Sequence, residues 1–123
     1  MTDAYTAQLP TTLRPVPPPR RESTWWRRGD AFVHVEHLGE PDAPIRAILL
    51  HGLGGNAGLL RPYAAALTQY GFHCVVPDLP GYGHTRVRRR AAVRYSDWVG
   101  VATDLVLRER ESHDGDFLLV SRV

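Results

Sequence analysis

Two short apolar runs, separated by a glycine-rich segment and a helical pattern, are what most constrain the fold of this chain. Residues 45–50 and 72–76 are nearly continuous apolar runs, as expected of strands covered on both faces in a parallel sheet. Between them, residues 59–70 repeat apolar side chains every three or four positions, which predicts a helix with one buried face. Gly71 stands where a helix commonly ends in a left-handed conformation. The order predicts one right-handed βαβ unit.

Each apolar run is followed by a loop with a distinctive motif. The first run leads into HGLGG at 51–55, and the second into DLPGYGHT at 78–85. Glycine has no Cβ, so such a backbone can turn tightly and come close to a ligand. Loops of this composition can therefore present backbone N–H groups to a bound molecule.

These two motifs, at this separation, resemble those of the α/β-hydrolase superfamily. In that family a His-Gly motif after the third strand starts the oxyanion loop, and D-x-P-G-x-G follows the fourth strand. A Tyr-x-x-Trp-Val sequence, matched at 95–99, is similar to the lysophospholipase-like or serine-aminopeptidase-like branch. The resemblance extends over about residues 25–120. It implies an α/β fold: a mostly parallel sheet with an antiparallel edge hairpin and helices on both faces.

The chemistry implied by the resemblance is hydrolysis of an ester or similar acyl bond by a serine hydrolase. Attack on the carbonyl puts negative charge on its oxygen, which preorganised N–H donors stabilise. By resemblance, the Leu53 N–H is one donor, and His51 braces the loop instead of acting as a base. The expected oxyanion-loop residues are His51, Gly52, Leu53 and Gly54, and those of the loop after the fourth strand are Asp78, Pro80, Gly81 and Gly83.

The resemblance also implies that the chain carries only the N-terminal half of the domain, truncated at the central strand. Residues 116–120 resemble the strand that leads into the nucleophile elbow, but Ser121-Arg122-Val123 follow in place of G-x-S-x-G. We expect a fragment without nucleophile elbow, acid or catalytic His, inactive alone, with an unpaired strand edge that invites aggregation. The substrate stays open among ester, lipid, thioester and peptide. The epoxide-hydrolase branch is disfavoured because Gly54 stands where that branch has proline.

Two readings from other classes remain. Residues 52–57 fit G-x-G-x-x-G/A between a strand and a helix, and Asp78 follows 78 − 52 = 26 residues on, near where a ribose-binding acid would lie. This pattern is typical of a nucleotide-binding module. The other reading is a noncatalytic interaction fragment that pairs its exposed strand with another chain.

The rest of the chain sets its organisation and its surroundings. Residues 1–23 contain five prolines and predict a disordered Pro/Arg-rich leader before the hydrolase half at 24–123. A hairpin is expected around Arg28-Gly29-Asp30.

No signal peptide or bilayer-spanning run is present, and the single cysteine, Cys74, reads as a buried thiol, so we expect a cytoplasmic protein. We expect no cofactor and no metal, since His34 and His37 fall on opposite faces of a strand.

Arginines gather after the second motif. All 15 basic residues of the chain are arginine, and five of them lie at 86–94, yet the net charge is only +2. We favour a solvated loop here over a nucleic-acid site, because charge clusters are more often surface than function. The partner expected from the resemblance is a small ester or acyl substrate. A second helix, capped by Ser96 or Asp97, is expected to follow and to run to about residue 111.

Overall fold

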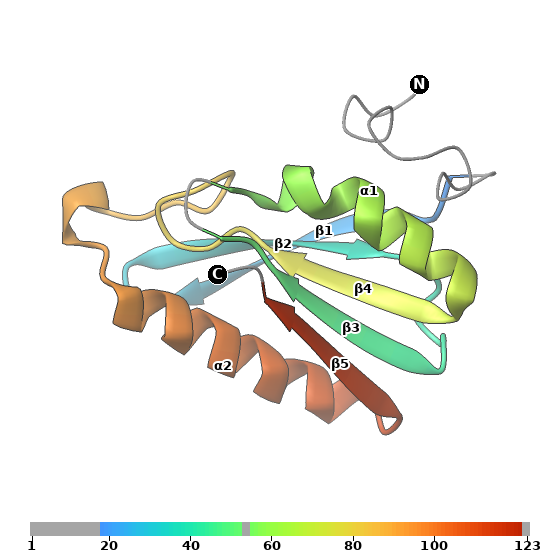
Figure 1. Ribbon diagram of the computed structural model, residues 1–123. Helices are drawn as coiled ribbons and strands as arrows, with labels where there is room; N and C mark the ends of the chain where they lie inside the picture. Colours follow the sequence, from blue (N-terminus) through green and yellow to red (C-terminus); the bar gives the residue numbers. More distant parts are fainter. Residues whose placement is uncertain (1–17, 53–54, 122–123) are drawn as a thin grey trace.

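The computed structural model describes residues 18–52 and 55–121 and forms one mixed sheet with a helix on each face (Figure 1). The strands are β1 (Arg21–Arg28), β2 (Ala31–Leu38), β3 (Ile45–Leu50), β4 (Phe72–Pro77) and β5 (Asp116–Ser121). The helices are α1 (Ala57–Leu67) and α2 (Tyr95–Ser112), with short 3₁₀ turns η3 (Thr68–Tyr70) and η4 (Arg90–Ala92). The predicted α/β class is confirmed. Most of the predicted leader, residues 1–17, lies outside the described residues, and β1 begins at Arg21.

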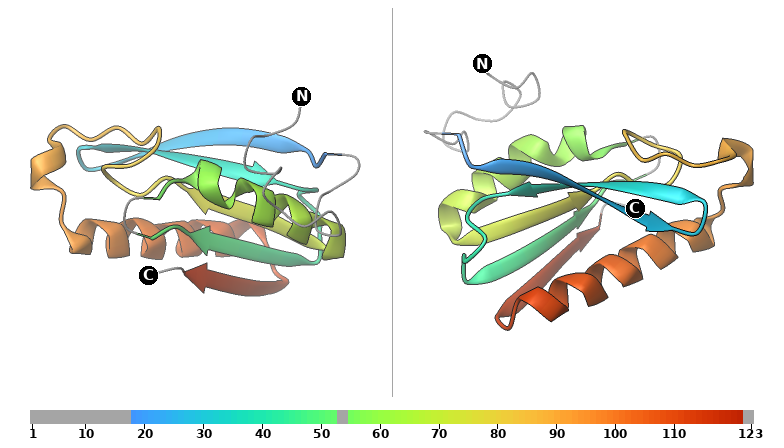
Figure 2. Two further views of the ribbon diagram at one scale, coloured as in Figure 1. Left: turned by 45° about the horizontal axis from the view of Figure 1, so that its top comes forward. Right: turned by 180° about the vertical axis from the view of Figure 1, so that it is seen from behind.

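The sheet has the order β1-β2-β4-β3-β5. β3 pairs in parallel with both β4 and β5, whereas β1 and β2 form an antiparallel hairpin whose second strand joins β4. Arg28 pairs with Ala31, so Gly29 and Asp30 form the two-residue turn, and Gly29 has a φ of 56°. The predicted βαβ unit and edge hairpin are both confirmed. Figures 1 and 2 show α1 on one face of the sheet and α2 on the other.

Two apolar clusters, one on each face, hold these layers together. Successive strand residues point to opposite faces, so each strand contributes to both clusters. Burial of one valine, leucine or isoleucine side chain stabilises the fold by roughly 1.5–3 kcal/mol. The buried members under α1 are Leu38, Ala47, Leu49, Ala57, Ala64, Ala65, Cys74 and Val76, and those under α2 are Val33, Val35, Ile48, Val75, Leu79, Val101 and Leu105.

The helix ends differ from the sequence prediction by a few residues. Asn56 caps α1 and its side chain accepts the Leu59 N–H at 3.2 Å, so the helix begins earlier than predicted and Pro62 lies in its second turn. The prediction that Ser96 or Asp97 caps α2 was wrong, because the cap residue is Arg94. Asp97 instead lies within the first turn, where its carboxylate accepts the Arg94 N–H at 2.8 Å.

β5 forms the outer strand of the described sheet on the side away from the hairpin. Its burial pattern is that of an exposed strand, although its apolar sequence predicted a buried one. Leu118, Leu119 and Val120 are 41%, 58% and 40% exposed. Within residues 18–52 and 55–121, β5 pairs only with β3, so the expected unpaired edge is present. Neither described helix has the length and apolar character needed to cross a membrane.

Candidate active site

The two motif loops lie at the same end of the sheet. β3 and β4 are parallel neighbours, so their carboxyl ends meet at one edge, toward which both arrowheads point in Figure 1. HGLGG follows β3 at this edge, and DLPGYG follows β4. In open α/β sheets ligands bind outside the carboxyl ends of the strands. Leu53 and Gly54, two of the predicted oxyanion-loop residues, lie outside the described residues.

His51 connects the two loops. Its Nε2 accepts the Leu79 backbone N–H at 2.9 Å, and its Nδ1–H donates to the Gly52 carbonyl oxygen at 2.9 Å. A backbone N–H can only donate and a carbonyl can only accept, so the ring carries its proton on Nδ1 and a lone pair on Nε2. The side chain is buried at 4% exposure. Both ring nitrogens are engaged within the protein, which leaves neither free to take a proton from a substrate.

Aromatic side chains enclose the His51 ring and join α2 to the loop. Tyr82 and Trp98 approach the ring edge to face, with centroids 5.6 and 6.5 Å away. The Trp98 indole N–H donates to the Pro80 carbonyl at 3.0 Å. The start of α2 is therefore fixed to the loop after β4 through a side chain of the Tyr-x-x-Trp-Val sequence.

Asp78 is the hub of the second loop. Its carboxylate accepts the Ala57 N–H at 2.7 Å, the His84 N–H at 3.0 Å and the His34 Nδ1–H at 2.8 Å. It is 1% exposed. Ala57 is the first residue of α1, where backbone N–H groups lack helical partners and negative charge is favourable. One buried carboxylate thus joins α1, β2 and the loop after β4.

Gly83 is required by the close approach of this carboxylate. Its φ is 56°, and a Cβ at this position would lie 2.1 Å from an Asp78 carboxylate oxygen. Gly81 also has a positive φ, of 92°, but a Cβ there would meet nothing within 4 Å. The two glycines of D-x-P-G-x-G therefore have different roles, since the first only permits the turn and the second also makes room for the buried aspartate.

Side-chain and backbone hydrogen bonds of Thr85 and Arg86 fix the segment after Gly83 against β2. The Thr85 hydroxyl accepts the His34 N–H at 2.9 Å and donates to the Asp78 carbonyl. Arg86 and Phe32 exchange a pair of backbone hydrogen bonds of 2.7 and 2.9 Å. The loop after β4 is thus held at several points along its length.

This geometry argues against the nucleotide-binding reading. A ribose-binding acid needs free carboxylate oxygens, whereas both oxygens of Asp78 accept hydrogen bonds within the protein. The Ala57 N–H, at the helix start where a pyrophosphate would bind, donates to Asp78. The pattern in the sequence is matched, but the groups that would serve a nucleotide already have partners.

Ser23, His34 and Asp78 form a hydrogen-bonded array that the sequence analysis did not predict. The Ser23 hydroxyl lies 3.0 Å from His34 Nε2, and His34 Nδ1 lies 2.8 Å from Asp78. The order matches that of a catalytic triad. However, Ser23 is exposed on edge strand β1 and lines neither described cavity, and the Trp25 ring packs on His34 at 4.7 Å. We interpret the array as a structural tie between β1, β2 and the loop after β4.

The other histidines of the sheet lie on the opposite face and form a pair. His37 Nδ1 lies 3.4 Å from His73 Nε2, and His73 Nδ1–H donates to the Gly39 carbonyl at 3.1 Å. Burial lowers the pKa of both rings. His34 and His37 therefore contact different partners on different faces. In the part of the chain that the structure describes, no group of three or more His, Cys, Asp or Glu side chains could hold a metal.

Cys74 is buried under α1, as predicted from the sequence. Its Sγ–H donates to the Ala64 carbonyl at 3.4 Å. Burial raises the pKa of the thiol to about 12. Because the thiolate is the nucleophile of cysteine chemistry, this residue is structural.

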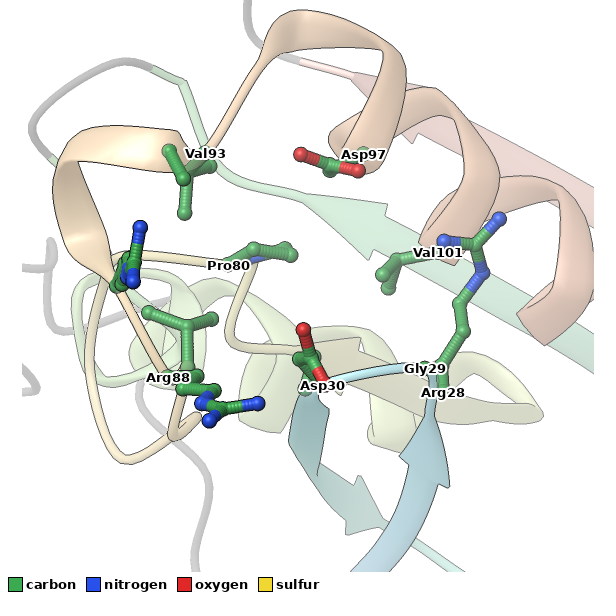
Figure 3. A pocket seen from close by; sticks show the side chains of 12 residues that line it. Arg28, Gly29, Asp30, Pro80, Arg88, Val93, Asp97 and Val101 are labelled. Atoms are coloured by element: carbon green, nitrogen blue, oxygen red, sulfur yellow. The ribbon is translucent and has the colours of Figure 1, made fainter.

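Two hollows border the loop after β4. A cavity of about 490 Å³ lies between the hairpin turn, this loop and α2 (Figure 3). A second, of about 390 Å³, lies between residues 80–82, η4 and the start of α2. Pro80 lines both hollows, so both lie beside the loop after β4, and His51 lines neither.

Comparison with protein families gives one match, to a model described as "alpha/beta hydrolase fold". It covers residues 48–112, which is more than half of the chain and includes both motif loops. No curated protein matches the chain.

Solved structures match over most of the chain. A thioesterase domain from the curacin biosynthetic pathway is 21% identical with a TM-score of 0.69, over 84% of this chain and 36% of that one. The epoxide hydrolase VrEH1 from Vigna radiata is 26% identical with a TM-score of 0.68, over 83% and 32%. A monoglyceride lipase from Saccharomyces cerevisiae is 14% identical with a TM-score of 0.68, over 84% and 34%. The chain thus spans about a third of the length of these proteins.

The comparisons do not select a branch. The similar structures include a thioesterase domain, a lipase and epoxide hydrolases, the last of which the sequence analysis disfavoured. The predicted lysophospholipase-like or serine-aminopeptidase-like branch stays a prediction.

Proposed function

Since the chain belongs to the α/β-hydrolase fold family, we propose that it supplies the oxyanion-loop half of a serine hydrolase that cleaves an ester or similar acyl bond. The observation that carries the proposal is the His51 ring, which bonds to Leu79 through one nitrogen and to Gly52 through the other. It joins the His-Gly loop to the D-x-P-G-x-G loop at the carboxyl end of the parallel strands.

In this proposal the residues of the chain position donors and do not transfer protons. Attack on an acyl carbonyl develops negative charge on its oxygen, which donors stabilise best when they are already in place. We assign the Leu53 N–H as one donor. His51 sets the start of its loop, and Asp78 sets the other end by accepting the first N–H of α1. The hydrogen bonds at both ends support a loop that needs little rearrangement during the reaction.

The finer assignment, to the lysophospholipase-like or serine-aminopeptidase-like branch, rests on the sequence at 95–99. Trp98 supports it, because this side chain contacts the His51 ring and bonds to Pro80. The nucleophile, the catalytic acid and the catalytic His are proposed to come from residues that this chain does not contain.

Resequencing the encoding DNA past the Val123 codon, in all three frames, gives the first test. We expect a frame that encodes G-x-S-x-G directly after FLLV, and we expect its product to hydrolyse p-nitrophenyl butyrate. His51→Ala in that product should lower kcat by up to about 100- to 1000-fold, the loss measured when one oxyanion donor is removed, because the Leu53 N–H is then no longer held in place. His84→Ala, which removes an exposed ring at the same end of the sheet, is the matched control and should change kcat less than about twofold, within the range of a neutral surface change.

The competing results are distinct. An active product in which His51→Ala has full activity would remove the role of this ring. An extended product with no hydrolytic activity toward esters, thioesters or amides would remove the proposed function itself.

A further inference from the structure

The loop after β4 is strongly basic, although the chain as a whole is not. Residues 79–96, the arginine loop, contain five arginines and no aspartate or glutamate. The net charge of the chain is +2, so all other residues together carry 2 − 5 = −3. The arginines are Arg86, Arg88, Arg89, Arg90 and Arg94.

These charges face solvent without carboxylate partners. All five side chains are exposed. Among the residues that the structure describes, none of the five forms an ion pair, and the one side-chain hydrogen bond is from Arg90 to the Gly81 carbonyl at 2.7 Å. The backbone of the loop is held by the Thr85 and Arg86 bonds described above. The arginine loop is therefore a surface with a fixed backbone, whose exposed arginines form no ion pair within the described residues.

The arginine loop projects from the end of the molecule that carries His51. In all three views of Figures 1 and 2, the loop and η4 lie beyond the carboxyl ends of β3 and β4 and are the outermost part of that end. A flat surface that approaches this end would therefore meet the arginine loop first.

The smaller cavity in this loop suits an anionic head group. It is lined by Arg90 and Arg94 together with the rings of Tyr82, Tyr95 and Trp98, and by no acidic residue. The larger cavity differs, because the carboxylates of Asp30 and Asp97 also line it (Figure 3). An anion is therefore favoured over the smaller cavity and not within the larger one.

We propose that the arginine loop docks the chain on an anionic lipid surface, with a head-group phosphate over the smaller cavity. Clustered arginines bind anionic lipids electrostatically, and tyrosine is favoured at the head-group level, where Tyr95, 69% exposed, would lie. A nucleic acid fits less well. A nucleic-acid strand longer than the loop would also meet the rest of the chain, whose net charge is negative. Of the three rings only Tyr95 is exposed, so successive bases have no aromatic surface on which to stack.

The docking is independent of hydrolysis and is tested by binding alone. The full 123-residue chain is sedimented with vesicles of phosphatidylserine and phosphatidylcholine, and with vesicles of phosphatidylcholine only. We expect binding to the anionic vesicles that weakens as salt is raised. Each arginine near the surface contributes about fivefold, so Arg90→Gln/Arg94→Gln, which removes both charges that line the smaller cavity, should weaken binding by about 30-fold. Both side chains are exposed, and the bond from Arg90 to the Gly81 carbonyl is the one side-chain hydrogen bond within the described residues that the substitution removes.

The matched control removes the same charge elsewhere. Arg21 and Arg110 are exposed at the start of β1 and near the end of α2, at the opposite end of the sheet from the arginine loop. Arg21→Gln/Arg110→Gln should therefore change vesicle binding less than about twofold, since charges beyond a Debye length are screened. Equal binding to both vesicle types, no binding to either, or an equal loss in both variants would overturn the proposal. So would displacement from the vesicles by single-stranded DNA at equal charge concentration, which would identify the loop as a nucleic-acid surface.

Discussion

Asp78→Asn should destabilise the fold far more than its near-identical shape suggests. The carboxylate accepts three hydrogen bonds, with Ala57 on one oxygen and with His34 and His84 on the other. The asparagine amide replaces one accepting oxygen by a donor. In either orientation of the amide one backbone N–H therefore loses its acceptor, either the buried one of Ala57 or the part-buried one of His84. Leaving such a donor unsatisfied costs about 1–3 kcal/mol.

Urea denaturation followed by circular dichroism measures this loss. We expect the midpoint to fall at an unchanged slope, which reports a change in stability alone. Asp42→Asn is the control, because Asp42 is exposed and has no bonded partner among the described residues, and it should shift the free energy by less than about 0.5 kcal/mol. If Asp78→Asn is no more costly than Asp42→Asn, the carboxylate is not the hub described here.

Three further results are expected. Gly83→Ala should destabilise the fold by at least about 1 kcal/mol more than Gly81→Ala in the same urea assay. Both glycines have a positive φ, but only at Gly83 would the new Cβ collide with the Asp78 carboxylate. Equal losses in the two variants would contradict this. Cys74, with a pKa of about 12, should react with a thiol reagent only after unfolding, and rapid reaction in the native state would count against its burial. The pKa values of His37 and His73 are lowered in the folded state, so the unfolded state binds more protons. The free energy of unfolding should therefore fall as the pH drops below 6.5, and this loss should be complete below both folded pKa values. His37→Gln/His73→Gln should flatten this pH dependence in melting curves.

The fold followed from the sequence where local pattern and buried surface agree. The apolar runs at 45–50 and 72–76 became β3 and β4, and the hairpin formed around Gly29. The sequence prediction failed at helix ends, because a single hydrogen bond determines which residue caps the helix. Asp97 has a capping side chain, but it bonds back to the Arg94 N–H from inside the first turn. β5 has a buried-type sequence and an exposed environment, because burial depends on neighbours that the sequence of one strand does not specify.

The site was only partly predictable. His51 and Asp78 lie at one end of the sheet because each directly follows a strand, as their motifs indicated, and their assignment to an oxyanion site stays a prediction. The bond from His34 to Asp78 was not predicted, because it depends on β2 pairing with β4 and spans 44 positions of sequence. If the pairing of β2 with β4 is assumed, His34 can be identified from the sequence, because it is a polar residue of β2 beside the end of β4.

The central claim is that His51 joins the two motif loops, and the position of the proton on its ring tests this claim most directly. Nitrogen-15 NMR of the 123-residue chain shows which ring nitrogen carries that proton. The account predicts a proton on Nδ1, a bare Nε2, and a through-bond coupling from Nε2 to the Leu79 amide, as the 2.9 Å contact implies. A proton on Nε2, or a ring that exchanges freely between the two forms without that coupling, would contradict it. His51 would then not join the two loops, and the proposed oxyanion loop would lose the residue that holds it in place.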